Sequence, residues 1–586
     1  MMMKFILLSL GALPLAATST TSTSFSPPTS VDKNNSDTRS QPWSGWGGTN
    51  HNNRWISSPS PSANKISSST IHTLTTHCKI TYPVGVSAPP AVSSSDTTAY
   101  YATWNGSVVA LDYKSCRVRW QLNVTALIID ENFGGPLDTL QTMTTVPVSR
   151  TSPQIDFEER ILYFGTQTRA LVVAADLDTG RVLGVRQINS HPAATITMSP
   201  TLYGGMLFVG CSSAEENAAF LLNGDPNSGG NETGYRYPCC TFVGNVVALT
   251  FSRAAGGFVT RWDVPMIPPD APTNGSEGRW SGIGVWGSQP AIDEERNQVF
   301  FATGNVYTAP AAYEACAEST TSNFDECLPE SIWQEAVLAL DIESGNPNWV
   351  RRLSPLDAWT LVCGVPGAIP RDPELCPHEP GPDADFGMAP AFVPSGDSDP
   401  EGKKDLVTLG QKNGNLYALD AATGELEWAT ATSPGGPGGG LMWGVAVDEA
   451  RVYFTAVNFA NQPWTLVPSN ATTNSSGFGA ASLGSGEVVW SVAAPPGTIT
   501  QVPPTVVSDL ALVGWSGPPP DGVPPVSPGP GGLLALQRET GAEVSRYELD
   551  GPFYGGIAVQ DEYVFVGTGY KQGTGEGHFY VLKVES

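Results

Sequence analysis

Residues 413–428, NGNLYALDAATGELEW, have the pattern of a short β-hairpin. The pair Asn413-Gly414 leads into a strand at 415–420 whose residues alternate between two environments, and a turn at 422–424 reverses the chain toward Trp428. Asn-Gly before alternating apolar residues is a strong hairpin signal, because both turn positions tolerate a positive φ. One hairpin cannot bury its own face, so a chain that uses this unit must stack copies of it.

Copies of the unit recur along most of the chain. They align at residues 107–120, 171–185, 245–262, 336–349, 415–428, 478–490, 533–547 and 579–584. The residue that aligns with Asp420 of the template is Asp112, Asp176, Thr250, Asp341, Asp420, Ser482, Gln537 and Lys583 in turn. Eight aligned positions predict eight structural units.

Two further apolar runs precede most of these hairpins, one of the kind found at 406–410. Four antiparallel strands per unit make a propeller blade. The last unit lacks a fourth strand, whereas residues 78–82 read as a strand with no blade of its own, and pairing the two would close the ring. We therefore predict an all-β, eight-bladed β-propeller closed by an N-terminal strand in the last blade. A parallel β-solenoid is the alternative, but its repeats are shorter and more uniform.

The composition agrees with one large β domain. The chain has 586 residues with 63 Gly and 50 Pro, and its apolar runs are short. Lys4 and the apolar run after it predict a signal peptide at 1–19, followed by a Ser/Thr-rich flexible leader at 20–42 and a single propeller domain at 43–586. We expect a secreted protein, because no later apolar run is long enough to span a bilayer.

The net charge of −26 argues against binding to nucleic acid or to anionic membranes. We expect a monomer without membrane insertion. Asn-x-Ser/Thr sequons predict a glycoprotein, although such short patterns also arise by chance in a Ser/Thr-rich chain. They occur at Asn34, Asn105, Asn123, Asn231, Asn274, Asn470 and Asn474.

The nine cysteines should mostly pair in an exported protein. The candidate pairs are Cys316 with Cys327, Cys363 with Cys376, and Cys78 with Cys116 if these two lie on neighbouring strands. Cys239 and Cys240 are adjacent, so they form either a vicinal disulfide or bonds to two separate partners, and Cys211 is left over. No Cys-x-x-Cys-His string is present, so a covalent c-type haem is not expected.

The spacing between the repeat units is uneven. The four longest insertions flank the third and fourth units, at 217–238, 265–280, 308–330 and 356–386. Long loops in a compact domain are often functional, so we place the functional face there.

The template, with its A-x-D-x-x-T-G-x-x-x-W core, resembles the repeat of pyrroloquinoline quinone (PQQ) enzymes. From about residue 43 onward the chain is most similar to polyvinyl alcohol dehydrogenase and its relatives, within the quinoprotein alcohol dehydrogenase-like family. The segments that carry this resemblance are WGGTNHNNRW at 46–55, SSAEE at 212–216, YPCCTFVGNVVAL at 237–249, VWGSQPAIDEERNQVFFATGN at 285–305, LDAW at 356–359, GPDADFGMAP at 381–390 and GQKNGNLYALDAATGELEW at 410–428.

The resemblance implies a flat quinone, PQQ, on the propeller axis beside a calcium ion. Such a site needs oxygen ligands for a hard cation, a carboxylate that takes the alcohol proton, and an aromatic that stacks on the quinone. By resemblance Glu215 and Asn305 bind calcium, Asp357 is the catalytic base, Trp286 stacks beneath the cofactor and Lys412 contacts the quinone oxygens. Each has an ordinary structural alternative: a solvated acid, a turn Asn, an Asx-turn Asp, a packing Trp and a solvated turn Lys.

Cys239 and Cys240 also match the family in place, which implies a cofactor-binding role like that of the vicinal disulfide of methanol dehydrogenases, although that pair comes earlier in their chain. The haem domain often fused to such enzymes has no counterpart here, so we expect an external electron acceptor. The leading hypothesis is a secreted oxidoreductase that oxidises a small or polymeric alcohol with PQQ and calcium. The alternatives are a quinone-free propeller, acting as a tailoring enzyme for a small natural product or as a ligand-binding protein, and an assembly scaffold.

Overall fold

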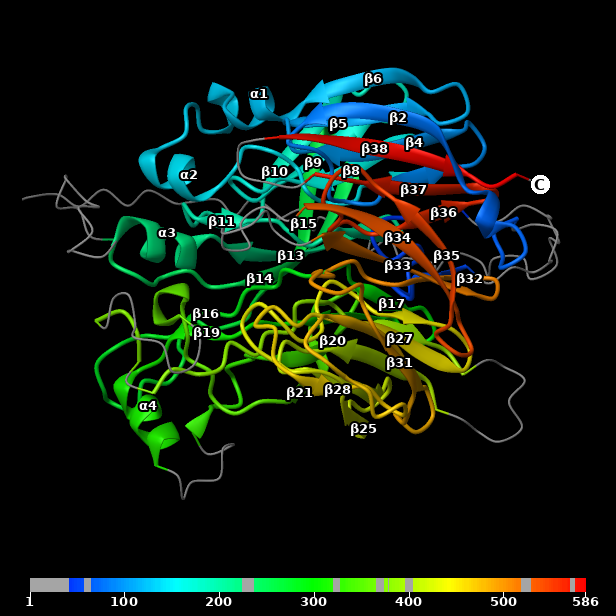
Figure 1. Cartoon of the computed structure of the whole chain (residues 1–586). Helices are drawn as coiled ribbons and strands as arrows, with labels where there is room; N and C mark the ends of the chain where they lie inside the picture. Colours follow the sequence, from blue (N-terminus) through cyan, green and yellow to red (C-terminus); the bar gives the residue numbers. More distant parts are fainter. Residues whose placement is uncertain are drawn as a thin grey trace, which may run out of the picture. The chain divides into compact units, whose positions relative to one another are not determined.

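The computed structural model describes residues 42–56, 65–223, 237–319, 327–364, 374–377, 379–395, 404–517, 529–569 and 575–585. The predicted signal peptide, the leader up to residue 41, and the sequons at Asn34 and Asn231 lie outside them. The described chain forms eight sheets that are each built on four antiparallel strands, and two of these sheets carry a fifth strand (Figure 1). This confirms the predicted all-β, eight-bladed propeller.

The first four blades follow one another along the chain. Blade 1 holds β3 (Ala91–Ser93), β4 (Thr98–Thr103), β5 (Ser107–Asp112) and β6 (Arg117–Asn123). Blade 2 holds β7 (Gln154–Asp156), β8 (Ile161–Gly165), β9 (Leu171–Asp176) and β10 (Val182–Gln187). Blade 3 holds β12 (Thr201–Tyr203), β13 (Met206–Ser213), β14 (Asn245–Ser252) and β15 (Gly257–Pro265). Blade 4 holds β17 (Ala291–Asp293), β18 (Gln298–Ala302), β20 (Ala336–Asp341) and β21 (Pro347–Arg352).

The other four blades repeat this plan. Blade 5 holds β22 (Ala391–Val393), β23 (Leu406–Gly410), β24 (Asn415–Asp420) and β25 (Leu426–Ala431). Blade 6 holds β26 (Ala446–Val447), β27 (Arg451–Ala456), β30 (Gly477–Ser482) and β31 (Val488–Ala493). Blade 7 holds β32 (Thr505–Val507), β33 (Leu510–Gly517), β34 (Gly529–Gln537) and β35 (Glu543–Glu548). Blade 8 holds β36 (Ala558–Gln560), β37 (Tyr563–Gly567), β38 (Glu576–Lys583) and β2 (Thr75–Pro83).

The strand β2 completes the last blade. It pairs antiparallel with β38, with Cys78 opposite Val581, and the two strands run side by side in Figure 1. Cys78 is also disulfide-bonded to Cys116, in the turn between β5 and β6 of blade 1. The predicted closure by the N-terminal strand is confirmed, and the disulfide ties the closing strand to the next blade.

Five of the template hairpins also link their blade to the next one. The indole of Trp349 in blade 4 donates a hydrogen bond of 3.0 Å to the carbonyl of Ala421, directly after Asp420 of blade 5. Its ring covers Gly424, where an added Cβ would lie 2.5 Å from a ring atom. The same arrangement recurs for Trp120 with Leu177, Trp262 with Ile342, Trp428 with Leu483 and Trp490 with Arg538. The template Trp therefore docks onto the neighbouring blade rather than only covering the end of its own sheet.

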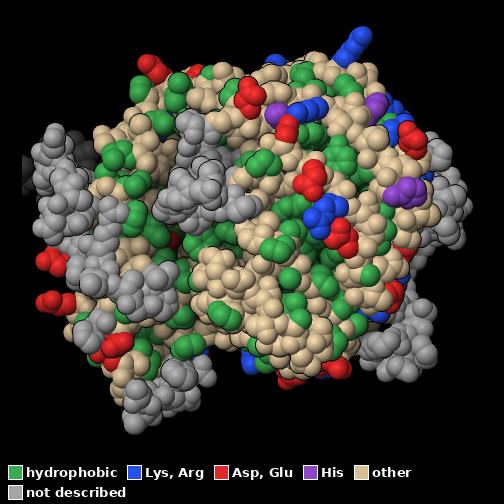
Figure 2. Space-filling view, viewed as in Figure 1, with side chains coloured by type: hydrophobic (Ala, Val, Ile, Leu, Met, Phe, Trp, Pro, Cys, Tyr) green, Lys and Arg blue, Asp and Glu red, His purple; other side chains and the backbone are tan. Residues whose placement is uncertain are grey.

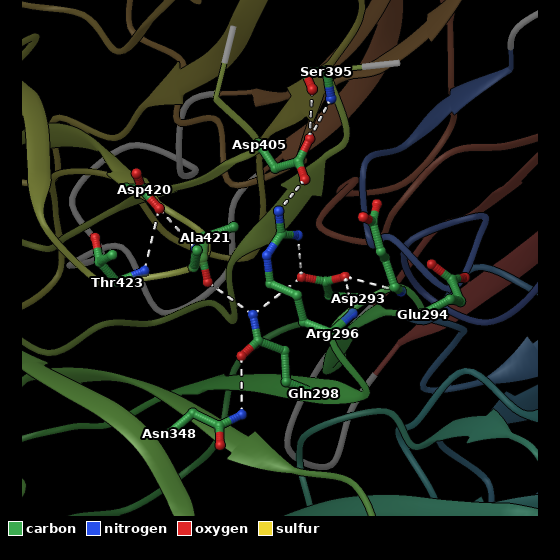
Figure 3. Close-up of polar contacts among 12 residues, drawn as sticks. Asp293, Glu294, Arg296, Gln298, Asn348, Ser395, Asp405, Asp420, Ala421 and Thr423 are labelled. Atoms are coloured by element: carbon green, nitrogen blue, oxygen red, sulfur yellow. Dashed lines mark hydrogen bonds and ion pairs between the residues drawn. The ribbon is translucent and has the colours of Figure 1, made fainter. Parts of the chain in front are cut away.

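Polar side chains add to the contact between blades 4 and 5 (Figure 3). Arg296, in the turn after β17, bonds to Asp293 at 2.8 Å and reaches across to Asp405 beside β23 at 2.6 Å. Gln298 at the start of β18 donates to the carbonyl of Ala421 at 2.8 Å. These bonds fix two blades that both carry residues of the central site.

Residues 43–56 run along the inner strands of the propeller. Their carbonyls accept hydrogen bonds from one amide each of β3, β17, β22, β26 and β32, and β1 (Trp55–Ile56) pairs parallel with β32. Arg54 is completely buried and donates to carbonyls of Trp46, Pro504 and Ile557. Its guanidinium lies over the rings of Trp43 and Trp46. This segment therefore joins blades from both ends of the chain.

The described residues form short helices on loops between strands, and the four α-helices lie toward the left of Figure 1. They are α1 (Val124–Ile128), α2 (Thr139–Thr144), α3 (Glu215–Leu222), α4 (Ala311–Glu318) and the 3-10 helices η1 (Ile71–Thr73), η2 (Glu131–Phe133) and η4 (Leu361–Cys363). The short strands outside the blades are β11 (Ala194–Thr195), β16 (Ser281–Gly282), β19 (Val306–Thr308), β28 (Trp464–Thr465) and β29 (Thr472–Thr473). In the part of the chain described, no helix combines the length and apolarity needed to cross a membrane.

The disulfides Cys316–Cys327, Cys363–Cys376 and Cys78–Cys116 are present as predicted. Cys239 and Cys240 bond to each other across a cis peptide, which selects the vicinal alternative, and Cys211 is free and buried. On the face shown in Figure 2, acidic and basic side chains lie scattered among polar and apolar ones.

Candidate functional site

A cavity of about 220 Å³ lies among the loops at the inner ends of blades 2 to 6. Each loop contributes one or two side chains to its wall, so the site is assembled from segments far apart in sequence. It is lined by Arg150, Thr195, Thr197, Ser212, Ser213, Glu216, Gly284, Trp286, Asn305, Tyr307, Asp385, Lys412 and Trp443. Of the residues predicted from the sequence, this set contains Trp286, Asn305 and Lys412.

Lys412 is buried in the wall of the cavity and paired with two carboxylates. Its Nζ lies 2.9 Å from both oxygens of Asp383 and 2.8 Å from Asp385 Oδ2, and it stands over the Trp286 ring at 5.5 Å. Burial lowers the pKa of Lys412, but the charges of Asp383 and Asp385 outweigh it and raise the pKa above its ordinary value. The lysine is therefore a fixed positive charge on an aromatic face, which is not the solvated turn lysine of the structural alternative.

Asn305 follows β18 and presents its amide to the same cavity. Its side-chain nitrogen donates to the carbonyls of Val306 and Trp359 at 3.0 and 2.9 Å, which leaves the amide oxygen for the cavity. Its backbone N–H donates to Asp385 Oδ1 at 2.6 Å. Asp385 also accepts from the Trp286 indole at 3.2 Å, so one carboxylate orders three parts of the wall.

Glu215 and Glu216 begin α3 and have different environments. Glu215 is fully buried outside the set of cavity-lining residues, and its oxygens accept from the Tyr237 hydroxyl at 2.9 Å and from the backbone N–H groups of Thr241 and Phe242 at 2.8 Å each. Burial raises the pKa of Glu215, but hydrogen bonds from His191 and these amides lower it below its usual value. Glu215 thus fixes the chain after the vicinal disulfide.

Glu216 lines the cavity, and its Oε1 is buried without a hydrogen-bond partner in the described chain. Burial, and next the negative charge of Asp385, raise the pKa of Glu216 to about 8, against the opposing effect of Lys412. The assignment of a calcium ligand to Glu215 stays a prediction, and the geometry favours Glu216.

Asp357 lies behind the cavity wall rather than in it. It is 1% exposed, and its oxygens accept from the backbone N–H groups of Asp383 at 3.2 Å and Ala384 at 2.7 Å. Its catalytic role stays a prediction, but the carboxylate that faces the cavity is Asp385, held on the loop that Asp357 supports.

The vicinal disulfide Cys239–Cys240 is outside the set of residues that line the cavity. Cys240 belongs to the apolar cluster that contains Phe242 and Tyr307, and Cys239 packs against that cluster. Tyr307 forms part of the cavity wall. The cofactor contact predicted for Cys239 and Cys240 stays a prediction.

A second cavity of about 240 Å³ adjoins the first and shares Arg150, Thr197 and Trp443 with it. Its lining adds Trp46, from the segment at 43–56, and residues next to blades 1, 4, 7 and 8: Ser87, Ser288, Gln501 and Tyr554. The indole of Trp46 donates to the carbonyl of Trp443 at 2.6 Å, and Arg150 stands 5.0 Å from the Trp443 ring. A cation between aromatic faces suits a ligand that is both flat and anionic.

The side chains present fit the groups that the family implies. Glu216, Asn305 and Asp385 offer oxygens only, which is the donor set that calcium prefers. Glu216 Oε1 has no protein donor to satisfy it, and a cation would supply the missing partner. Trp286 and Lys412 offer an aromatic face and a positive charge beside these oxygens.

Sequence reasoning missed several residues of this site, namely Glu216, Arg150, Asp383, Asp385 and Trp443. Glu216, Asp383 and Asp385 stood inside segments already matched to the family, SSAEE and GPDADFGMAP. The order of residues alone did not show which of two neighbouring acids points inward. Arg150 and Trp443 belong to no matched segment, and only the ring brings them to the axis.

The chain is similar to known proteins in sequence and in fold. No family model matches the chain. Over 414 residues it is 27% identical to a polyvinyl alcohol dehydrogenase of Pseudomonas sp., covering 70% of this chain and 54% of that protein. It is 28% identical over 361 residues to the polyvinyl alcohol dehydrogenase of Sphingopyxis sp. (strain 113P3), covering 60% and 47%. The chain thus spans about half the length of the curated relatives it matches.

Among solved structures, the quinohemoprotein alcohol dehydrogenase of Comamonas testosteroni superimposes with a TM-score of 0.61 at 15% identity, over 92% of this chain and 80% of that one. At this identity the likeness speaks for the fold. Taken with the sequence matches, it confirms the resemblance of this chain to the PQQ-repeat quinoprotein alcohol dehydrogenase-like proteins, the polyvinyl alcohol dehydrogenases among them.

Proposed function

We propose that this protein is an alcohol-oxidising quinoprotein that holds PQQ and Ca²⁺ in the axial cavity. The observation that carries the proposal is the convergence of Glu216, Asn305, Asp385, Trp286 and Lys412 on one cavity from separate loops of the propeller. Similarity to polyvinyl alcohol dehydrogenases supports the same conclusion. Oxygen ligands, a cation and an aromatic face together are what a flat, anionic quinone on a hard metal ion needs.

The residues divide the work by their chemistry. Glu216 and Asn305 are the oxygen ligands for the cation, and Trp286 offers the face on which the cofactor stacks. When bound, the cofactor accepts the hydride that leaves the alcohol carbon. Lys412 sets a positive charge beside the quinone oxygens and holds Asp385 in place.

We assign the proton acceptor to Asp385. A general base must be ionised before reaction and within reach of the substrate. Asp385 lines the cavity, and its carboxyl oxygens accept hydrogen bonds from the Asn305 N–H, the Trp286 indole and Lys412, which fix its position. Asp357, by contrast, would need its loop to move before it could meet a substrate.

The remaining parts of the proposal concern the setting. Alcohol oxidation releases electrons, and we infer that an external acceptor takes them. We also propose that residues 1–19 are a signal peptide, that 20–42 form a leader, and that the propeller at 43–586 acts outside the cytoplasm as a glycosylated monomer.

Reconstitution tests the function directly. The purified protein is titrated with Ca²⁺ and PQQ, and reduction of an electron-accepting dye is followed with primary, secondary and polymeric alcohols. Asp385→Asn should bind both additions and lose turnover, whereas the exposed Glu543→Gln should match the wild type. A folded protein that binds neither PQQ nor Ca²⁺ would refute the proposal.

The second cavity favours one alternative, a quinone-free propeller that binds a small anionic aromatic molecule or modifies it. Arg150 between Trp443 and Trp104 is the observation behind it. In that case an aromatic carboxylate should quench tryptophan fluorescence without any Ca²⁺, and Arg150→Gln should remove the effect while dye reduction stays absent.

A further inference from the structure

Asp357 and Glu335 form a buried pair of carboxyl groups behind the loop that carries Asp383 and Asp385. Glu335 is 0% and Asp357 1% exposed, and the two side chains hydrogen-bond to each other. Neither belongs to the set of residues that lines the cavity. Their place directly behind the wall indicates a supporting function.

The pair needs one proton, because two carboxylates cannot hydrogen-bond to each other. Asp357 is the acceptor, since its oxygens already receive the N–H groups of Asp383 and Ala384, which favour an ionised carboxylate. Glu335 has Ser354 and Gln411 as neutral hydrogen-bond partners, the Gln411 bond to Oε2 being long at 3.3 Å, and Glu335 Oε1 has no N–H or O–H donor among the described residues. The proton therefore resides on Glu335.

The loop that carries Asp383 and Asp385 has a backbone conformation that needs support from Asp357. Asp383 lies in the left-handed region with φ 57°, which a residue other than glycine adopts only under constraint. Gly381 gives Asp357 room, because a Cβ there would lie 1.9 Å from Asp357 Oδ1. The loop then places Asp383 and Asp385 on Lys412.

We propose that Glu335 and Asp357 are a positioning pair: Glu335 donates its proton to Asp357, and Asp357 holds the Asp383–Asp385 loop against Lys412. The activity arm of its test rests on the proposed function, whereas the spectroscopic arm does not. In this arrangement Asp357, which lies behind the cavity wall, determines the position of Asp385, which faces the cavity.

Three variants separate a proton donor from mere packing. Glu335→Gln keeps a donor toward Asp357 and should leave kcat near the wild-type value. Glu335→Leu removes the donor, and Asp357→Asn sets an NH₂ group against a backbone N–H. Glu335→Leu and Asp357→Asn should each lower kcat by roughly 10- to 100-fold with KM nearly unchanged, as is usual when a residue that orients a functional side chain is removed. Equal losses in Glu335→Gln and Glu335→Leu would overturn the proposal.

Infrared spectroscopy tests the proton without any activity. The comparison is made in the Glu216→Gln background, because Glu216 is also expected to be protonated near neutral pH. The carbonyl stretch of a buried, protonated carboxyl group should be present in that protein and lost when Glu335→Gln is added. An unchanged spectrum would refute the proposal even if the protein oxidises alcohols, whereas a lost band in a protein without dehydrogenase activity would keep the pair and reject the function.

The pH dependence follows from the groups that face Glu335. These are the carboxylates of Asp357 and Asp385, with Ser354 and Gln411 as neutral partners. When the proton leaves at high pH, Glu335 and Asp357 repel each other and the loop loosens, so activity should fall on the alkaline side. Glu335→Gln has no proton to lose there and should remove this part of the pH profile.

Discussion

Glu215 and Glu216 are neighbours in sequence, yet the structure predicts opposite results when each is changed to glutamine. Glu215 accepts two backbone N–H groups and a tyrosine hydroxyl, whereas Glu216 Oε1 is buried in the cavity wall without a partner. Glu215→Gln should therefore damage the fold and Glu216→Gln the cation site. Family resemblance alone predicts the reverse, since it places calcium on Glu215.

The magnitudes follow from the contacts. In Glu215→Gln the new NH₂ group must face the N–H of Thr241 or Phe242, so at least one hydrogen bond to a charged group is lost, about 2–3 kcal/mol of stability. For Glu216, burial raises the pKa to about 8, so the folded protein takes up a proton that the unfolded chain lacks at neutral pH. At about 1.4 kcal/mol per pKa unit, with partial exposure of this side chain, Glu216→Gln should stabilise the metal-free protein by about 1–2 kcal/mol at pH 7.

The sign of the second effect depends on pH. A carboxyl group with a raised pKa in the folded state costs no stability below its unfolded pKa, and the cost grows as the pH rises toward the folded value. The advantage of Glu216→Gln should therefore vanish in acid and be largest at weakly alkaline pH.

The test is urea denaturation at several pH values, together with calorimetric Ca²⁺ titration, of the wild type, Glu215→Gln and Glu216→Gln. The expected results are an unstable Glu215→Gln that still binds Ca²⁺ and a stable Glu216→Gln that does not. The reasoning is refuted if Glu215→Gln has wild-type stability and no Ca²⁺ affinity while Glu216→Gln binds normally.

Three other predictions concern the framework. Gly424→Ala and Gly256→Ala both put a side chain at φ near +70°, but of the two only Gly424 faces an indole, that of Trp349. In urea denaturation we expect Gly256→Ala to lower the free energy of unfolding by about 1 kcal/mol and Gly424→Ala to lower it by at least about 3 kcal/mol. Equal losses would contradict the docking role of Trp349. Arg54→Met should lower the thermal midpoint by several degrees, since the carbonyls that it bonds are left buried and unpaired, and scanning calorimetry measures it. Stability should also fall in acid as Glu215, whose pKa is lowered in the folded state, takes up a proton, a loss that pH titration of Glu215→Gln should no longer show.

The fold was accessible from the sequence because its signals are local and repeated. Asn-Gly turns, alternating residues and the Asp420 position recur often enough that counting them yields the number of blades, even where Ser482 and Gln537 replace the Asp. The unpaired strand near Cys78 predicted the closure for the same reason. The role of Trp428 was harder, because the surface on which it docks belongs to the next repeat and is adjacent only in space.

The site was accessible only in part. Trp286, Asn305 and Lys412 lie where the family pattern expects them, each on a loop that directly follows or precedes an inner strand. Glu216 and Asp385 could not be told from their neighbours by pattern, since the choice depends on which face of a short helix or loop meets the axis. Burial and hydrogen-bond partners show which acid faces the cavity, and neither property can be read from the sequence alone.

The contacts of the segment at 43–56 affect how the protein can fold during its synthesis. The partners of this segment lie in blades 1, 4, 5, 6, 7 and 8. The strand β2 likewise cannot form its hydrogen bonds until β38 has been synthesised. At 5–20 residues per second, synthesis of the intervening chain takes on the order of a minute. During that time the earliest strands stand with open edges that would pair with any other chain. We therefore expect the nascent chain to depend on chaperones until β38 has been synthesised, and deletion of β38 to leave a chain that aggregates rather than a propeller with a missing blade.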